Sequence, residues 1–261
     1  MAGKLALATV LHDPEGQMVP HVTAALDRLR DRFDAVAVCL TEATAPHVRD
    51  FFADRLNASI GVHPTGEDQI GFGRRRSVEL ALGFDCTQIL YADLDHVLRW
   101  LDVDRPGLDV TLDMARQAGL TIIGRSEVAM KDVPRRLVET EEPLNRAYTL
   151  LTGRQADLFA AVRAFDRATA ETIVTHSRVD SFGNDVEWPL LAERHGHRVI
   201  ALFSDALTYR TMEEFGAASD SHDRDPAQWL RRITMAAEQA LAFGPFLGMA
   251  TGSIDAPPPR P

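Results

Sequence analysis

The chain has 261 residues, of which 45% are hydrophobic and 25% are charged, as is usual for a globular domain with one sizeable core. Its formal net charge of -10 argues against a nucleic-acid partner, which favours a basic face. The two cysteines, Cys39 and Cys86, form no disulfide framework, and no apolar run approaches the roughly 20 residues of a membrane-spanning helix. We therefore expect a cytoplasmic protein without a transmembrane segment.

Short apolar runs, partly β-branched and bounded by polar or turn residues, predict strands. These strands are expected at 5–10, 35–40, 59–62, 88–92, 120–124, 157–164 and 199–203. Segments with apolar residues at helical spacing predict helices. The helices are expected at 19–33, 46–56, 73–82, 110–117, 141–151, 186–195 and 226–242. This alternation favours an α/β fold with a mainly parallel sheet, in which ligands bind beyond the carboxyl ends of the strands.

The ends of two helices carry recognisable signals. Gly196 follows the helix expected at 186–195 as a C-cap, and Asp225-Pro226 opens the last helix with an N-cap and a first-turn proline. Residues 1–250 contain no repeat or linker, so we predict a single domain there. Residues 251–261 contain four prolines and are expected to be disordered.

Two aspartates, Asp93 and Asp95, directly follow the apolar run 88–92. A buried strand would deliver both carboxylates to the carboxyl edge of the sheet. Hard oxygen ligands of this kind suit Mg²⁺ or Mn²⁺, which would neutralise a diphosphate leaving group. The alternative is a pair of solvated aspartates that cap the next turn.

The sequence 71–77, Gly-Phe-Gly-Arg-Arg-Arg-Ser, opens the helix that precedes this strand. Glycines before a helix free backbone N–H groups for an anion, and arginines add charge-assisted hydrogen bonds. Three arginines near the positive end of the helix dipole favour an anionic partner over a solvated helix start. Arg74 and Arg76 are therefore candidate donor-binding residues.

From 5 to 210, the sequence resembles the family 2 glycosyltransferases of the GT-A fold, especially the branch of polyprenyl-phosphate sugar synthases. The stretches that carry the resemblance, in the family's order, are 71–95, 118–126, 157–163, 182–199 and 208–210. The resemblance implies a nucleoside-diphosphate sugar as donor and Mn²⁺ or Mg²⁺ as cofactor. It also implies inversion at the sugar, while the acceptor, a hydroxyl or a phosphate, and any homo-oligomer are left open.

The resemblance also assigns roles to single residues. Asp93 would lie near the ribose or the metal, and Asp95 would bind the metal. Three arginines would face phosphates, namely Arg125, Arg163 and Arg210. Asp185 and Glu187 would lie on the acceptor side, where we favour Asp185 as general base and Glu187 as its alternate. A helix N-cap is the competing interpretation of Asp185.

Two loops depart from the family's pattern. The first expected strand ends in Leu-His-Asp-Pro and the second in Thr-Glu, so Asp13 and Glu42 stand where the family holds the nucleobase. Both are candidate donor-binding residues, but the identity of the base stays open. His222 could serve as a third metal ligand, and a surface histidine is the competing interpretation.

Two other classes compete with a glycosyltransferase. In a haloacid-dehalogenase-like phosphatase, Asp93 and Asp95 would be the nucleophile motif and 180–185 the late acidic motif. That fold usually begins near the nucleophile strand, whereas three strand–helix units precede it here, and Lys131 stands too close to Ser126 to be the required lysine. The other alternative is a GT-A module that binds a nucleotide without turnover, which the altered nucleobase loops favour.

Overall fold

The computed structural model describes residues 4–209 and 222–249, and seven strands in this part of the chain form one sheet. The strands are β1 (Leu5–Leu11), β2 (Ala35–Thr41), β3 (Ser59–His63), β4 (Gln88–Ala92), β5 (Leu120–Arg125), β6 (Val162–Asp166) and β7 (Val199–Ser204). Their order is β3-β2-β1-β4-β6-β5-β7. Strand β6 is antiparallel to both of its neighbours and every other pairing is parallel. The α/β fold with a mainly parallel sheet is confirmed.

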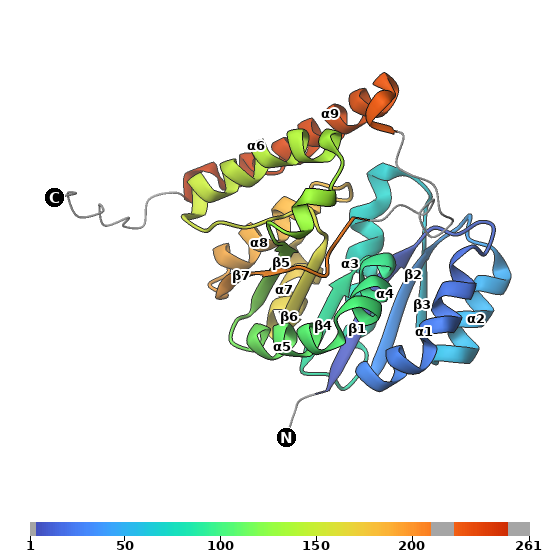
Figure 1. Cartoon of the computed structure of the whole chain (residues 1–261). Helices are drawn as coiled ribbons and strands as arrows, with labels where there is room; N and C mark the ends of the chain where they lie inside the picture. The colour runs from blue at the N-terminus through green and yellow to red at the C-terminus, as the bar shows by residue number, and fades with distance from the viewer. Residues whose placement is uncertain (1–3, 210–221, 250–261) are drawn as a thin grey trace.

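Helices cover both faces of this sheet (Figure 1). The longer ones are α1 (Met18–Arg32), α2 (Pro46–Leu56), α3 (Ile70–Leu82), α4 (Leu94–Val103), α5 (Arg105–Ala115), α6 (Arg135–Thr152), α7 (Arg167–His176), α8 (Asn184–Arg194) and α9 (Pro226–Leu241). Short 3-10 helices lie at Glu67–Gln69, Ala129–Asp132, His222–Arg224 and Gly244–Met249. Helices α1, α2, α4 and α5 share one buried apolar cluster, whereas α3, α7 and α8 share the other. Helices α6 and α9 run side by side, joined by the Arg232–Glu141 ion pair.

The strand expected at 157–164 was wrong at its start, because β6 begins only at Val162. The Asp157 carboxylate accepts hydrogen bonds from the backbone N–H and the side chain of Arg125, which holds this segment beside the end of β5. Ala161 has a φ of 51°, so the chain turns immediately before the strand. Local side-chain bonding therefore outweighs the strand propensity of the residues before Val162.

The helix expected at 73–82 begins earlier, at Ile70, so Gly71 and Gly73 lie inside its first turn. The N–H of Gly71 donates to the carbonyl of Asp180, and a Cβ at Gly71 would stand 2.5 Å from the carbonyl oxygen of Ser181. This glycine therefore serves close backbone packing against the loop before α8. The expectation of a loop that leaves N–H groups free for an anion was wrong here.

Two helices, α4 and α7, were not expected from the sequence. The signal for α4 was present, because Leu94, Val97, Leu98 and Leu101 repeat at helical spacing and are all buried. At the other end of the chain the expected caps are confirmed. The Asp225 carboxylate accepts from the N–H of Ala227, and Gly196 ends α8 with a φ of 81°.

The order of the strands places a topological switch between β1 and β4. Strands β2 and β3 extend the sheet from one side of β1, and β4 lies on the other side. The connection after β1 leads to β2 on one side and the connection after β4 leads to the other half of the sheet, so the two diverge at the carboxyl ends, where open α/β sheets bind their ligands. Within residues 4–209 and 222–249, no helix combines the length and the apolar composition needed to cross a bilayer.

Candidate functional site

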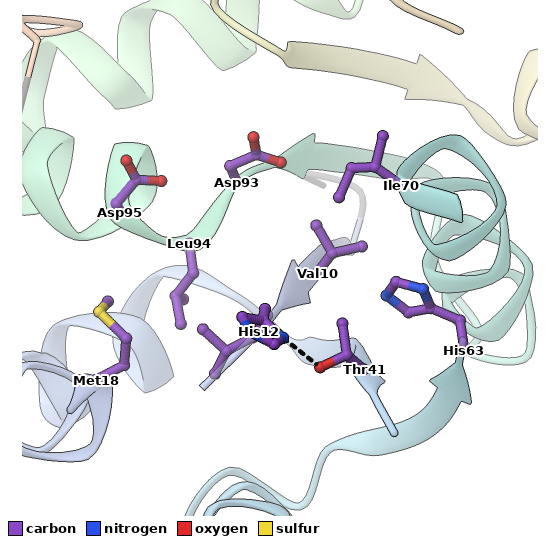
Figure 2. Close-up of a pocket in the computed structure, with 10 residues that line it drawn as sticks. Val10, His12, Met18, Thr41, His63, Ile70, Asp93, Leu94 and Asp95 are labelled. Carbon is purple, nitrogen blue, oxygen red and sulfur yellow. Dashed lines mark hydrogen bonds between the residues drawn. The ribbon is translucent and has the colours of Figure 1, made fainter. Parts of the chain in front are cut away.

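A pocket of about 250 Å³ opens at this switch point, at the carboxyl ends of four parallel strands (Figure 2). Its lining residues come from the ends of β1, β2 and β3 and from the starts of α1, α3 and α4, with Asp93 at the N-cap of α4. They are Val10, Leu11, His12, Met18, Thr41, His63, Ile70, Asp93, Leu94 and Asp95. Both aspartates singled out in the sequence therefore line one pocket.

The Asp93 carboxylate is held from two sides. The hydroxyl of Tyr91 donates to Oδ1 at 2.5 Å, and Nη2 of Arg74 donates to Oδ2 at 3.0 Å. Burial raises the pKa of Tyr91 well above its ordinary value, so this hydroxyl stays protonated and able to donate. The Asp93 side chain is still 28% exposed and lines the pocket. A carboxylate held in this way is pre-organised for a cation.

Asp93 occupies the N-cap position of α4, but its side chain makes no capping hydrogen bond. The interpretation as a solvated capping residue therefore does not describe Asp93. Asp95 lies in the first turn of α4, where the helix dipole favours a negative charge, and it is half-buried.

The donor set at this pocket fits a divalent cation. Among residues 4–209 and 222–249, no group of three His, Cys, Asp or Glu side chains is placed to hold a metal ion. Mg²⁺ is commonly held by one or two carboxylates and completed by water and substrate phosphates. Asp93 and Asp95, which both line the pocket, would supply such a pair of hard oxygen ligands.

Arg74 connects Asp93 to Asp185 inside the protein. Its Nη1 donates to Oδ1 of Asp185 at 2.9 Å and to Oδ1 of Asn184 at 3.2 Å, and the side chain is only 2% exposed. Burial opposes the charge, yet Asp185 and Asp93 together raise the pKa of Arg74 well above its ordinary value. The guanidinium is therefore permanently charged, and its Nη1 and Nη2 groups are paired with protein carboxylates.

The two expected general bases lie in the first turn of α8. Burial raises the pKa of Asp185, while Arg74 and Arg163 act against that rise. The Glu187 carboxylate accepts from the Ser177 hydroxyl at 2.5 Å and from the N–H of Arg178 at 2.8 Å. Both side chains are buried, and neither lines the pocket between β1 and β4.

Arg125 and Arg163 are also buried. Arg125 donates to Asp157 at 2.7 Å and to Glu141 at 2.6 Å, and Glu141 also accepts from Arg232. Arg163 donates to backbone carbonyls, including that of Leu158. Among the described residues, both guanidinium groups are thus engaged with the protein and lie away from the aspartate pocket.

Arg76 and the two loop carboxylates also lie outside the pocket lining. Arg76 pairs with Glu79 on the partly exposed side of α3. The buried Asp13 carboxylate accepts from the N–H groups of Gln17 and Met18, and so fixes the start of α1. Glu42 lines a neighbouring pocket of about 270 Å³, which shares Thr41 with the first.

Two further predicted residues stand at or beyond the edge of the described chain. Arg210 lies outside the described residues. His222 begins the 3-10 helix beside Asp223, which accepts from Arg136. His222 is absent from the lining of the aspartate pocket.

The pocket also contains residues that the sequence argument missed. His12 and Thr41 lie at the ends of β1 and β2, joined by a 2.8 Å hydrogen bond, and His63 ends β3. The reasoning that placed Asp93 at the carboxyl edge applies equally to polar residues at the ends of these strands. The signal was therefore present in the sequence.

A larger groove of about 810 Å³ lies between α6 and β7, away from the β1–β4 switch point. Arg125, Arg146, Gln155 and Phe203 contribute to its walls. It contains neither of the aspartates that follow β4. The groove is therefore separate from the candidate metal ligands.

No protein-family profile and no curated protein matches this sequence. Among solved structures, the fold is similar to that of glucosyl-3-phosphoglycerate synthase from Mycobacterium tuberculosis. Its complex with Mn²⁺, uridine-diphosphate and phosphoglyceric acid is 13% identical, with 89% of this chain and 79% of that chain covered and a TM-score of 0.49. Another structure of that synthase is 15% identical, with 89% and 81% covered and a TM-score of 0.48. These values are too low to carry the ligands or the activity over to this chain.

Proposed function

We propose that this chain is a metal-dependent glycosyltransferase of the GT-A type that transfers a sugar from a nucleoside-diphosphate sugar to an acceptor hydroxyl or phosphate. The observation that carries the proposal is the Asp93 carboxylate, oriented by Tyr91 and Arg74 and partly open to a pocket at the β1–β4 switch point. Open α/β sheets bind their ligands at this position. Asp95 supplies the second carboxylate from the adjacent helix turn.

Mn²⁺ or Mg²⁺ held by Asp93 and Asp95 would neutralise negative charge on the departing diphosphate, usually a large contribution to such catalysis. The chain's own residues prepare that site. Tyr91 and Arg74 fix the rotamer of Asp93 before the donor arrives, so little reorganisation is required on binding. Arg74 thus acts through Asp93 in this proposal, and does not itself contact a phosphate.

Asp185 is the general base that we propose, with Glu187 as its alternate. A raised pKa suits a carboxylate that must accept a proton near neutral pH. To do so, Asp185 would have to exchange its hydrogen bond with Arg74 for one with the acceptor. Glu187 would have to release Ser177 and the N–H of Arg178, which makes it the less accessible of the two.

A thermal-shift panel tests the donor site. We expect one of UDP, GDP, CDP and dTDP to raise the Tm in the presence of Mn²⁺ but not in its absence. Asp95→Ala should abolish the metal-dependent shift, and Asp205→Ala, an exposed aspartate near the end of β7, is the matched control. Undiminished binding by Asp95→Ala would contradict the proposal.

Turnover separates the glycosyltransferase from its alternatives. We expect slow, Mn²⁺-dependent release of the nucleoside diphosphate from the preferred sugar nucleotide, with water as acceptor, lost in Asp95→Ala and reduced in Asp185→Asn. Binding without release would indicate a non-catalytic module. Release of inorganic phosphate from a phosphomonoester, lost in Asp93→Asn, would instead indicate a phosphatase.

A further inference from the structure

His63 is buried at the end of β3 and only 2% exposed; the Pro64 carbonyl lies near its ring, but neither ring nitrogen has a hydrogen-bond partner of good geometry. Buried polar groups are nearly always paired, and an unpaired one calls for an explanation. Figure 2 shows the ring turned into the pocket, toward Thr41, Val10 and Ile70. Its unused hydrogen-bonding capacity therefore lies at the wall of the candidate donor site.

The position of this ring is specified by the helix beside it. A Cβ at Gly73 of α3 would stand 2.5 Å from Nε2 of His63 and closer than 3.0 Å to two of its ring carbons. Glycine in a helix costs stability relative to alanine. The sequence accepts that cost at Gly73, and the space gained is filled by the His63 ring.

The environment of His63 favours the neutral imidazole. Burial lowers its pKa, and His12 acts in the same direction, whereas the Pro64 carbonyl and Glu42 oppose the change. A neutral imidazole offers one N–H donor and one acceptor nitrogen. It is therefore complementary to an uncharged polar group and offers no positive charge to a phosphate.

The pocket thus has two chemically different sides. Asp93 and Asp95 lie on one wall, whereas His12, Thr41 and His63 lie on the opposite wall (Figure 2). A ligand that matches both sides carries a metal-bound diphosphate at one end and a neutral heterocycle at the other. The pocket volume is about 250 Å³, and a one-ring base requires less of that volume than a purine does.

We propose that His63 hydrogen-bonds the base of a pyrimidine nucleoside diphosphate, which would make it a residue that selects the donor. This inference rests on the proposed function, because it takes the aspartate side of the pocket as the diphosphate site. The inference adds the class of base and a residue at the end of β3 that contacts the base. His12, held by Thr41, borders the same wall of the pocket.

Calorimetric titrations test the inference, with UDP, CDP and GDP in the presence of Mg²⁺ and with Mg²⁺-pyrophosphate as the probe that lacks a base. We expect the wild-type chain to bind UDP or CDP about 10-fold more tightly than GDP. His63→Leu should weaken the pyrimidine nucleotide about 10-fold, the loss of one buried hydrogen bond, and leave Mg²⁺-pyrophosphate affinity unchanged within about twofold. His63→Gln should recover part of the loss, and His195→Ala, at an exposed histidine, is the matched control.

Different results would overturn different claims. Equal loss of pyrophosphate and nucleotide affinity in His63→Leu would mean that His63 only supports the fold, and a preference for GDP would exclude the pyrimidine. If Mg²⁺-pyrophosphate binds and depends on Asp95 while the base adds no affinity, this inference fails alone. If no probe binds, the proposed function fails and this inference fails with it.

A measurement on the wild-type chain covers the case in which His63→Leu does not fold. In spectra of ¹⁵N-histidine-labelled protein, UDP with Mg²⁺ should shift a ring-nitrogen signal of a neutral, buried histidine that is unmoved by Mg²⁺-pyrophosphate. The signal is assigned to His63 by its absence from His63→Gln. A His63 signal that UDP leaves in place would overturn the inference.

Discussion

Arg74 and Arg125 are both buried and both bind two carboxylates, but the carboxylates differ in exposure. The partners of Arg125, Asp157 and Glu141, are 7% and 4% exposed, and both accept further hydrogen bonds from the protein. One partner of Arg74, Asp185, is 7% exposed, whereas Asp93 is 28% exposed and lines a pocket. The Arg125 cluster is closed in the sense that both of its carboxylates are almost fully buried, although Arg125 and Asp157 border the larger groove, whereas the Arg74 cluster is more open at Asp93.

The comparison separates two roles that look the same in a sequence. A buried arginine satisfied on all sides by carboxylates supports the fold, and removing it leaves charges without compensation. A buried arginine that orients a partly exposed carboxylate also prepares that carboxylate for a ligand. The exposure of the carboxylate partners, and not the burial of the arginine, is therefore what distinguishes the two clusters.

Replacement of Arg125 should produce the largest effect. Arg125→Met leaves Asp157 and Glu141 buried beside one another, so we expect a loss of about 3–5 kcal/mol in the free energy of unfolding, measured in urea. The affinity for Mn²⁺-diphosphate of the molecules that remain folded should not change. Arg135→Met removes an exposed, solvent-screened ion pair and should leave the stability nearly unchanged. A stable Arg125→Met variant would break the comparison.

Replacement of Arg74 should reduce stability less than replacement of Arg125 does, but should reduce the affinity for Mn²⁺-diphosphate more. In Arg74→Met, water can reach Asp93, and Nη2 of Arg163 lies 3.9 Å from Asp185, so we expect a loss of about 2–3 kcal/mol. The affinity for Mn²⁺-diphosphate should fall about 10-fold, because Asp93 loses an orienting partner. Urea unfolding and calorimetry measure the two effects. Unchanged metal-dependent affinity would show that Arg74 is as purely structural as Arg125.

Acid should destabilise the Arg125 cluster by protonating Asp157. Burial alone would raise its pKa, but Arg125 lowers it to about 2, below the ordinary value of 3.8. Asp157 therefore contributes stability above pH 3.8 that is lost as the pH falls through 2, about 2 kcal/mol in all. The pKa of Glu141 is raised by burial, so its contribution is present below its ordinary value of 4.5 and is lost as the pH rises.

Unfolding in urea at pH 5, 3 and 2 separates the pH-dependent contribution of Asp157 to stability from that of Glu141. Between pH 3 and 2, the wild-type chain should lose stability that Asp157→Asn does not lose, since the amide has no proton to gain. Parallel curves for the two proteins over this interval would contradict the assigned pKa of Asp157.

The smallest effect is expected for Tyr91→Phe. Loss of one hydrogen bond to Asp93 should cost about 1 kcal/mol of stability and weaken Mn²⁺-diphosphate binding about threefold, because Arg74 still holds the other oxygen. Tyr148→Phe removes another buried hydroxyl, bound to Arg154, and should leave the affinity unchanged. If Tyr91→Phe matched Arg74→Met in affinity, the two contacts would act as one unit.

Periodicity was sufficient for most of the fold. The alternation of strands and helices predicted the mainly parallel sheet, and the position of Asp93 and Asp95 after an apolar run predicted that both reach its carboxyl edge. Periodicity failed to predict the structure at 157–161, where the carboxylate of Asp157 binds Arg125 and the chain stays out of the sheet. The burial of that ion pair depends on α6, which supplies Glu141 from a distant part of the sequence.

By itself, the sequence determined which residues alternate into strands and which carboxylates stand at strand ends, because side-chain periodicity is a local property. Only the tertiary structure decided which arginines are enclosed by carboxylates, and that β1, β2 and β3 bring His12, Thr41 and His63 opposite Asp93. These arrangements depend on contacts between residues far apart in the chain. Burial and charge pairing act through such contacts, so a pattern read along the sequence cannot distinguish an arginine that supports the fold from one that prepares a site.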